Sequence, residues 1–319
     1  MRRLIECVPN FSEGRDLARV SELVRSVESA SGARVLDVHS DPDHNRSVVT
    51  FAGEPAAVEQ AALAAVGKAA ELIDLTQHRG EHPRIGATDV LPFVPLEGVT
   101  MAECAALARR VGEEIWQRYR IPVYFYEYAA TRPDRERLEN VRRGQFEGLS
   151  QAARIDPKRA PDVGTGGLHP TAGAIAVGAR KPLIAYNITL DTRDVSVAED
   201  IARKIRESNG GLTALKAIGV AVRSRGLAQV SMNLTDFEVT SIEQAFEAVR
   251  REAERRVCTI EGSEIVGLVP ERALDLTGDY FAQLDSFSRD QILEQRIASV
   301  FGESAPQNAT APRGAQSSV

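Results

Sequence analysis

The chain has 319 residues, of which 43% are hydrophobic, 39 are lysine or arginine and 45 are aspartate or glutamate. The net charge of −6 and the lack of a basic block argue against a nucleic-acid-binding protein. No apolar run is long enough to span a membrane, and the N-terminus lacks the apolar stretch of a secretory signal. We therefore expect neither a membrane-spanning helix nor a secretory signal.

The first half of the chain alternates between strand-like and helix-like segments. Helices are indicated by apolar residues at helical spacing, and one of them begins at a proline. We expect strands at 4–10, 33–40, 47–53, 88–96 and 121–129, and helices at 16–30, 55–73 and 101–119. The charged segment that follows, 131–149, is expected to pack on the outside.

The second half repeats this order, with strands at 181–190, 215–224, 227–237 and 264–270, and helices at 194–208 and 241–256. Both halves have the order of split β-α-β units, so the sequence predicts an α+β fold of two ferredoxin-like subdomains. We expect these subdomains to span 1–180 and 181–301 and to face each other across a ligand tunnel. The polar tail 302–319 is expected to be disordered.

The cysteines and two of the histidines give little chemical information. Cys7, Cys104 and Cys258 are few and far apart, which fits a reduced cytoplasm and provides no disulfide framework or cysteine metal site. His39 and His44 flank a "DPD" turn, whose carboxylates can raise a histidine pKa, but such pairs are more often surface residues.

The stretch "HRGEH" at 78–82 raises the question of a zinc site, because it matches the H-x-x-E-H pattern of one group of zinc peptidases. That pattern works on a helix, where residues four apart share a face. Gly80 within the motif and Pro83 after it both oppose a helix, so we expect His82 in a loop. From these residues alone, an acid–base histidine, a zinc ligand and a solvated loop all remain open.

Four asparagines lead Asn-x-Ser/Thr triplets at or near expected strand ends: Asn10, Asn45, Asn187 and Asn233. Turn and cap chemistry explains such residues, and the alternative is that some of their amides bind a polar ligand in a cleft. Asn10 and Asn187 follow the first strand of each half, which favours a shared surface.

The glycine-rich stretch "DVGTGGLHPTAGA" at 162–174 matches neither the dinucleotide fingerprint nor the P-loop. Its glycines would let backbone amides approach a ligand closely, or it is a flexible crossover between the halves. Arg46, Arg84 and Arg180 lie beside these loops, and arginine holds carboxylates by a planar two-point grip.

Taken together, several stretches resemble the glutamate formimidoyltransferases, in order from about residue 3 to residue 275. They are "ECVPNFSEGRD", "DPDHNRSVVTFAGEP", "IDLTQHRGEHPRIGATDVLPFVPL", "GARKPLIAYNITL" and "LAQVSMNLTDFEVT". The resemblance implies two ferredoxin-like subdomains with a folate tunnel, in a homodimer. It also implies transfer of the formimino group of N-formimino-L-glutamate to N5 of tetrahydrofolate in histidine degradation, by a cytoplasmic enzyme without the cyclodeaminase domain of its animal counterparts.

The same resemblance assigns roles to particular residues. His82 matches the catalytic histidine of the family. The family contacts folate at the stretch Val163, Gly164, Thr165, Gly166, Gly167, Leu168, His169, Pro170, Thr171 and Ala172, which is richer in glycine here than in animal members. The residues that we consider for substrate binding are Asn10, Arg46, Arg84, Arg180, Asn187 and Asn233.

The expected chemistry suits a single histidine. N5 of tetrahydrofolate loses a proton as it attacks, the departing glutamate nitrogen gains one, and an imidazole with a pKa of about 6.5 can do both. The protonated amidine is already electrophilic, so we expect no metal. The alternatives are a formyltransferase that uses N-formylglutamate, a zinc amidohydrolase, and a folate-binding protein without turnover.

Overall fold

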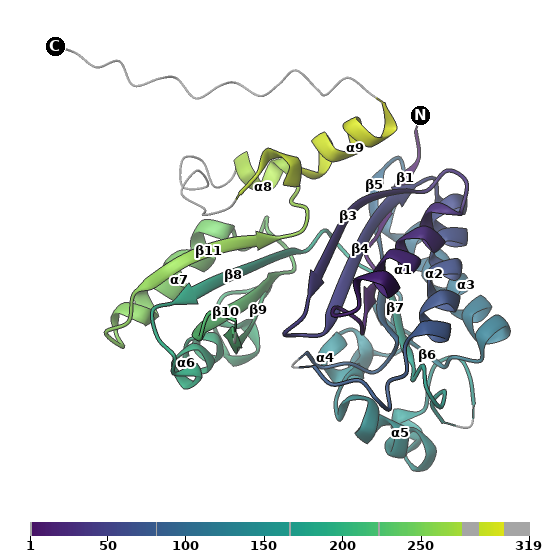
Figure 1. Ribbon diagram of the computed structural model, residues 1–319, viewed down its shortest axis with the longest axis horizontal. Coiled ribbons are helices and arrows are strands. Elements are labelled where there is room, and N and C mark those ends of the chain that lie inside the picture. Colours follow the sequence, from purple (N-terminus) through teal and green to yellow (C-terminus); the bar gives the residue numbers. More distant parts are fainter. Residues whose placement is uncertain (1, 81, 166, 223, 276–286, 303–319) are drawn as a thin grey trace.

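The computed structural model describes residues 2–80, 82–165, 167–222, 224–275 and 287–302, which form two groups of elements, each built around one sheet (Figure 1). The larger sheet contains β1 (Leu4–Cys7), β2 (Asn10–Phe11), β3 (Arg34–Asp41), β4 (Arg46–Gly53), β5 (Thr88–Glu97), β6 (Val123–Glu127) and β7 (Ile175–Ala179). Its helices are α1 (Leu17–Glu28), α2 (Pro55–Leu72), α3 (Met101–Tyr119), α4 (Leu138–Val141) and α5 (Gln145–Ile155).

The helices begin where the sequence supplies caps. Asp16 accepts hydrogen bonds from the first turn of α1, α2 has proline at its start, and Thr100 and Glu103 form a capping box on α3. The positions of these three helices confirm the sequence prediction to within a few residues.

The larger sheet is mixed, whereas the ferredoxin-like arrangement that we expected has an antiparallel sheet. Strand β4 lies between β3 and the β1–β2 segment, and β5 follows on the other side, all with antiparallel pairing. Beyond β5 lie β7 and then β6, both parallel to their neighbours. The sequence reading missed β7, because its small residues Ile175–Ala179 resemble a continuation of the preceding glycine-rich stretch.

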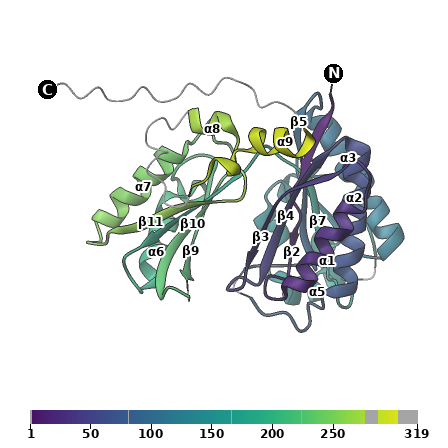
Figure 2. The ribbon, with the colours of Figure 1, turned by 45° about the horizontal axis from the view of Figure 1, so that its top comes forward.

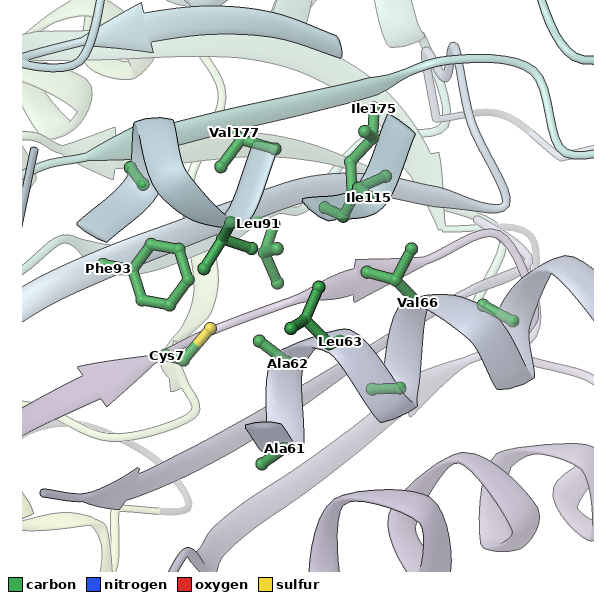
Figure 3. Close-up of a cluster of buried hydrophobic side chains, with 14 of the residues drawn as sticks. Cys7, Ala61, Ala62, Leu63, Val66, Leu91, Phe93, Ile115, Ile175 and Val177 are labelled. Carbon is green, nitrogen blue, oxygen red and sulfur yellow. The ribbon is translucent and has the colours of Figure 1, made fainter. Parts of the chain in front are cut away.

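One face of this sheet is covered by α1, α2 and α3, and the main hydrophobic core lies between these layers (Figure 3). Alternate residues of the strands point into it, including Leu91 and Phe93 of β5, which pack towards Leu63 of α2 and Ile115 of α3. This face carries most of the buried apolar surface of the elements that surround the larger sheet.

The other face is partly covered by the charged segment after β6, which corrects our expectation that this segment packs outside. Tyr124 and Tyr126 of β6 point to this face and form a hydrophobic cluster with Val141 and Leu149. The few apolar residues of this segment therefore face inwards, whereas most of its charged residues stay exposed. The spacing of the apolar residues was too irregular to reveal this arrangement.

The smaller sheet has the order β11-β8-β10-β9, with antiparallel pairing throughout. Its elements run in the order β-α-β-β-α-β: β8 (Ile184–Leu190), α6 (Val195–Ile205), β9 (Leu215–Val222), β10 (Leu227–Leu234), α7 (Ile242–Glu254) and β11 (Ile260–Val266). The side chains of Tyr186, Ile188 and Val230 lie in the core with α6 and α7. The alternate residues of the same strands, among them Asn187 and Asn233, lie on the opposite face.

The helix-free face of the smaller sheet is turned towards the face of the larger sheet that lies opposite α1, α2 and α3 (Figures 1 and 2). Lys216, on the helix-free face of β9, lies 3.2 Å from the carboxylate of Glu139 in α4. At the other end, α8 (Glu271–Asp275) and α9 (Leu293–Phe301) follow β11, and α9 returns to the larger sheet, where Arg296 Nε donates to the carbonyl of Leu36 at 2.7 Å. Sequence reading missed both helices.

Most of the C-terminal tail lies outside the described residues, so its expected disorder remains a prediction. Among the described residues, no helix is both long and apolar enough to cross a membrane.

Candidate active site

The HRGEH loop packs onto the turn between β3 and β4. A side chain at Gly80 would place its Cβ only 2.2 Å from the carbonyl oxygen of His44, so this close approach requires glycine. The Asn45 side chain closes the contact by donating from Nδ2 to the Arg79 carbonyl at 3.0 Å. His82 lies outside any helix, as expected, and so does His78, whereas Glu81 lies outside the described residues.

His82 is anchored through Nδ1. This atom lies 2.7 Å from the Pro83 carbonyl oxygen and 2.6 Å from Nη1 of Arg46. The two contacts suit opposite tautomers, because the carbonyl requires a proton on Nδ1 and the guanidinium requires a lone pair. With the proton on Nδ1, Nε2 carries the lone pair that a general base needs.

Arg46 links His82 to two further polar residues. Its Nε donates to Asn10 Oδ1 at 3.0 Å, and its Nη1 lies 3.2 Å from Asp89 Oδ2. The Asp89 carboxylate is only 1% exposed, and it also accepts from the backbone N–H of Ile85 and from Arg142 Nη2. The structure thus joins the predicted Asn10, Arg46 and His82 to two residues that sequence reasoning missed.

The missed residues are Asp89 and Arg142. Asp89 stands in "GATDVLPF", where a carboxylate before a buried strand suggests only a turn. Arg142 stands in the charged segment that we expected outside, more than fifty positions further along the chain. Nothing in the local sequence pattern relates them, because only the fold brings α4 to the start of β5.

The surroundings of His82 favour its neutral form. Burial, together with the positive charges of Arg46 and Arg142, holds the pKa of His82 well below its usual range. Burial and the neighbouring Arg142 also lower the pKa of Arg46, to about 10. At neutral pH the site therefore combines an uncharged imidazole with an arginine that is still protonated.

A second histidine near His82 has the opposite electrostatic setting. His44 Nδ1 lies 2.5 Å from Asp41 Oδ2, and the rings of His44 and His82 are 6.3 Å apart, edge to face. The hydrogen bond to Asp41 raises the pKa of His44. Although burial acts against it, hydrogen bonding from His44 lowers the pKa of Asp41 to about 2.

His78 belongs to a separate buried network. Its Nε2 lies 2.9 Å from the Asn45 carbonyl oxygen, and its Nδ1 accepts from Arg84 Nε at 3.1 Å. Both ring nitrogens are thus used within the protein, and a zinc ion at His78 would have to displace one of them. Within the described ranges, no group of three or more His, Cys, Asp or Glu residues is placed to hold a metal ion.

The position of Arg84 differs from the one that we expect for a residue that binds substrate. It is 7% exposed, and it grips Glu147 at two points, with Nη1···Oε2 and Nη2···Oε1 distances of 3.0 and 2.8 Å. With Nε on His78, most of its donors are occupied. The structure therefore makes Arg84 the anchor between the HRGEH loop and α5.

The remaining polar candidates are spread over the two facing sheets. Arg180 follows β7, and its Nη1 donates to the Lys181 carbonyl at 2.9 Å. Asn187 lies in the middle of β8, where it donates to Glu264, and not after the strand as we expected. Its predicted correspondence with Asn10 is therefore wrong, because a full seven-residue strand runs through this position.

The first part of the stretch 163–172 lies at the β6 edge of the larger sheet. Val163 forms an isolated bridge with Val123, and Gly164, with φ of 109°, approaches the ring of Trp116 so closely that a Cβ would lie 2.9 Å from it. These contacts give the stretch a packing role at α3 and β6.

The last part of the stretch lies beside the segment that leads into β5. His169 Nδ1 accepts from the backbone N–H of Ala172 at 2.9 Å, and the Ala172 carbonyl accepts from the N–H of Ala87. Ala87 lies two residues before Asp89, so this end of the stretch supports the backbone of the site. Gly166 lies outside the described residues.

Two protein-family models together match most of the chain. The formiminotransferase domain, N-terminal subdomain, matches residues 4–180, and the formiminotransferase domain matches residues 185–301. The chain belongs to the formiminotransferase family. The cluster of His82, Arg46, Asp89 and Arg142 lies within the first match, and Asn187 and Asn233 lie within the second.

Curated formiminotransferase relatives cover almost the whole chain. The glutamate formimidoyltransferase of Streptococcus pyogenes serotype M1 is 45% identical over 93% of this chain and 99% of its own length. That of Thermoplasma acidophilum is also 45% identical, over 92% of this chain and 97% of its own length. The formimidoyltransferase-cyclodeaminase of Mus musculus is 42% identical over 86% of this chain, but the match spans only 51% of the mouse protein.

Proposed function

We propose that this chain is a glutamate formimidoyltransferase, which transfers the formimino group of N-formimino-L-glutamate to N5 of tetrahydrofolate. The observation that carries the proposal is its 45% identity, over nearly the full length of both chains, to an enzyme of that name. The surroundings of His82 support it, because they place a neutral imidazole next to cationic groups that suit an anionic substrate.

His82 is the proton carrier in this proposal. N5 of tetrahydrofolate attacks the carbon of the protonated formimino group, and a C–N bond forms. The proton on N5 passes to Nε2 of His82, while Nδ1–H donates to the Pro83 carbonyl. His82 then gives this proton to the glutamate nitrogen, the C–N bond to glutamate breaks, and glutamate leaves. The reaction is balanced, and it needs no covalent enzyme intermediate.

The substrates are proposed to lie between the two facing sheets. The order β11-β8-β10-β9 and the chain order β-α-β-β-α-β support a ferredoxin-like smaller subdomain, and the β5-β1-β4-β3 part of the larger sheet has the same arrangement. Asn187 and Asn233 then line one wall of a tunnel, opposite the wall that carries His82. Folate contacts within 163–172 remain proposed from family resemblance.

Three further features belong to the same proposal. We infer a boundary between subdomains near residue 180, where β7 of one sheet ends and the chain crosses to β8 of the other. A homodimer is inferred from the family resemblance. A cytoplasmic location is inferred from that resemblance and from three free cysteines, two of which are buried.

A turnover assay with tetrahydrofolate tests the proposed function. N-formimino-L-glutamate and N-formyl-L-glutamate should be supplied in parallel, and the folate product should be identified in each case. We expect 5-formiminotetrahydrofolate from the first donor, at a rate well above that from the second. Preference for the formyl donor would make the protein a formyltransferase, and no transfer from either would reject the proposal.

A further inference from the structure

Arg142 has unused hydrogen-bond donors beside His82. Within the described parts of the chain its side chain donates a single hydrogen bond, from Nη2 to Asp89, and its buried Nε has no partner. A guanidinium group has five N–H donors, so a partner that the protein does not supply can bind here. This contrasts with Arg84, which is held by Glu147 and His78.

The charge of the cluster indicates what that partner is. Two guanidinium groups, from Arg46 and Arg142, share the single carboxylate of Asp89, and His82 adds no charge in its neutral form. The cluster therefore has an excess positive charge in a place where water is scarce, since the two arginine side chains are only 16% and 15% exposed. A buried excess of this kind is stabilised by an anion.

The position of the cluster relates this anion to the reaction. Arg142 and His82 are joined through Asp89 and Arg46 by an unbroken series of contacts. An anion on Arg142 would thus lie in the same cluster as the proposed proton carrier, whose pKa responds to the charge of Arg142. Among the proposed substrates, the donor has two carboxylates close to the group that reacts, and planar guanidinium donors match a carboxylate at two points.

We propose that Arg142, beside Arg46, binds a carboxylate of the amino-acid donor and thereby positions its formimino group at His82. This inference rests on the proposed function and adds to it a residue that determines donor affinity. Asp89 acts through the two arginines, because its carboxylate contacts both of them.

The arrangement also couples donor binding to the protonation of His82. In the free protein, Arg46 and Arg142 both disfavour a proton on His82. A bound carboxylate offsets their charge, so His82 accepts a proton more readily once the donor is in place. The imidazole then becomes a better base at the step where N5 loses its proton.

The variant Arg142→Gln tests the inference, with Arg143→Gln as its matched control. Arg143 is the exposed neighbour, and its side chain makes no hydrogen bond among the described residues. We expect Arg142→Gln to raise the donor KM by about 10- to 100-fold, the usual range for a lost charged hydrogen bond, and to leave the tetrahydrofolate KM within about threefold. Arg143→Gln should leave both constants unchanged.

L-Glutamate, which carries the same carboxylates as the donor, provides a readout that needs no turnover. The titration of His82 should be followed by NMR of the 13C-labelled histidine ring, with and without L-glutamate, and the signal assigned with His82→Gln. In wild type, glutamate should raise the pKa of His82, and in Arg142→Gln it should have little effect. An equal rise in both proteins would overturn the inference.

The outcomes separate this inference from the proposed function. Wild-type protein that transfers no formimino group rejects the function, whatever Arg142 does. If the wild-type protein transfers the formimino group but Arg142→Gln leaves the donor KM unchanged, the inference about Arg142 is rejected and the proposed function stands. If Arg142→Gln does not fold, Arg142→Lys should be used in its place, because lysine keeps the charge but cannot bind a carboxylate at two points. An unchanged donor KM in Arg142→Lys would likewise reject the inference.

Discussion

Arg46 Nη1 lies 2.6 Å from Nδ1 of His82, so the histidine of the HRGEH loop is in direct contact with a guanidinium group from the start of β4. Burial and this contact together explain how the imidazole can remain uncharged at neutral pH. The positive charge of a doubly protonated His82 would be repelled by Arg46 and by Arg142.

The first prediction concerns the acid limb of the pH–rate profile. Because the pKa of His82 lies well below its usual range, kcat/KM should stay level as the pH falls through about 6.5, the ordinary histidine pKa. Arg46→Gln removes one of the charges that disfavour the proton, so its acid limb should move to higher pH. Arg79→Gln removes a charge from the same loop and should leave the limb in place. An acid limb that is identical in wild type and Arg46→Gln would contradict this electrostatic account.

The second prediction concerns the Asp41–His44 pair. The folded pKa of His44 is raised above 6.5, so its contribution to stability is present below pH 6.5 and is lost as the pH rises through the folded value. The folded pKa of Asp41, about 2, is below its ordinary 3.8, so its contribution is present above pH 3.8 and is lost as the pH falls towards 2. His44→Gln should therefore lower the melting temperature more at pH 5 than at pH 9. Equal losses at both values would show that the pair is not ionised as described.

The third prediction concerns Glu6, a carboxyl in the centre of the larger sheet. It is 6% exposed, and burial raises its pKa from 4.5 to about 7, even though Arg180 acts in the opposite direction. A carboxyl with a raised folded pKa destabilises the protein increasingly as the pH rises from 4.5 to 7. Glu6→Gln should therefore stabilise the protein at pH 8, by about 3 kcal/mol at most, and have little effect at pH 4.

Glu97→Gln, on the exposed end of the neighbouring strand β5, is the matched control for Glu6. Denaturant unfolding at the two pH values gives the comparison. A stabilisation by Glu6→Gln that does not depend on pH would mean that the pKa of Glu6 is the same in the folded and the unfolded protein.

The fourth prediction concerns the anchor formed by Arg84 and Glu147. Glu147→Gln removes one charge of a two-point ion pair whose carboxylate is 62% exposed, so the loss of stability should be small, about 1 kcal/mol. The KM values for the donor and for folate should stay within about twofold. A large increase in the donor KM would indicate that Arg84 takes part in substrate binding. It would also weaken the proposal that Arg142 binds the donor carboxylate.

The sequence predicted the regular elements of this fold better than its long-range contacts. Helix caps such as Asp16 and Thr100 act locally, and the alternation of strand residues reports which face is buried, so most helices and strands were found near their true positions. Strand β7 and helix α9 were missed, because small residues and a short apolar face have no distinctive local pattern.

The same limit applies to the site. Gly80 and Pro83 correctly indicated that His82 lies in a loop, since both act on their own backbone. The contact between Asp89 and Arg142 joins residues that are far apart in the chain, and it depends on the α4–α5 segment folding back over β6. No local rule connects such residues, and for the same reason the sequence did not predict the ion pair between Arg84 and Glu147.

The central claim is that His82 carries the proton in formimino transfer, and the kcat of His82→Ala tests it most directly. The variant should be compared with wild type at saturating N-formimino-L-glutamate and tetrahydrofolate, with folate affinity measured separately. We expect kcat to fall by about 10²- to 10⁴-fold, the usual range for a positioned proton-transfer group, while folate affinity changes little. A kcat within about tenfold of wild type would contradict the account, since another group would then have to move the proton.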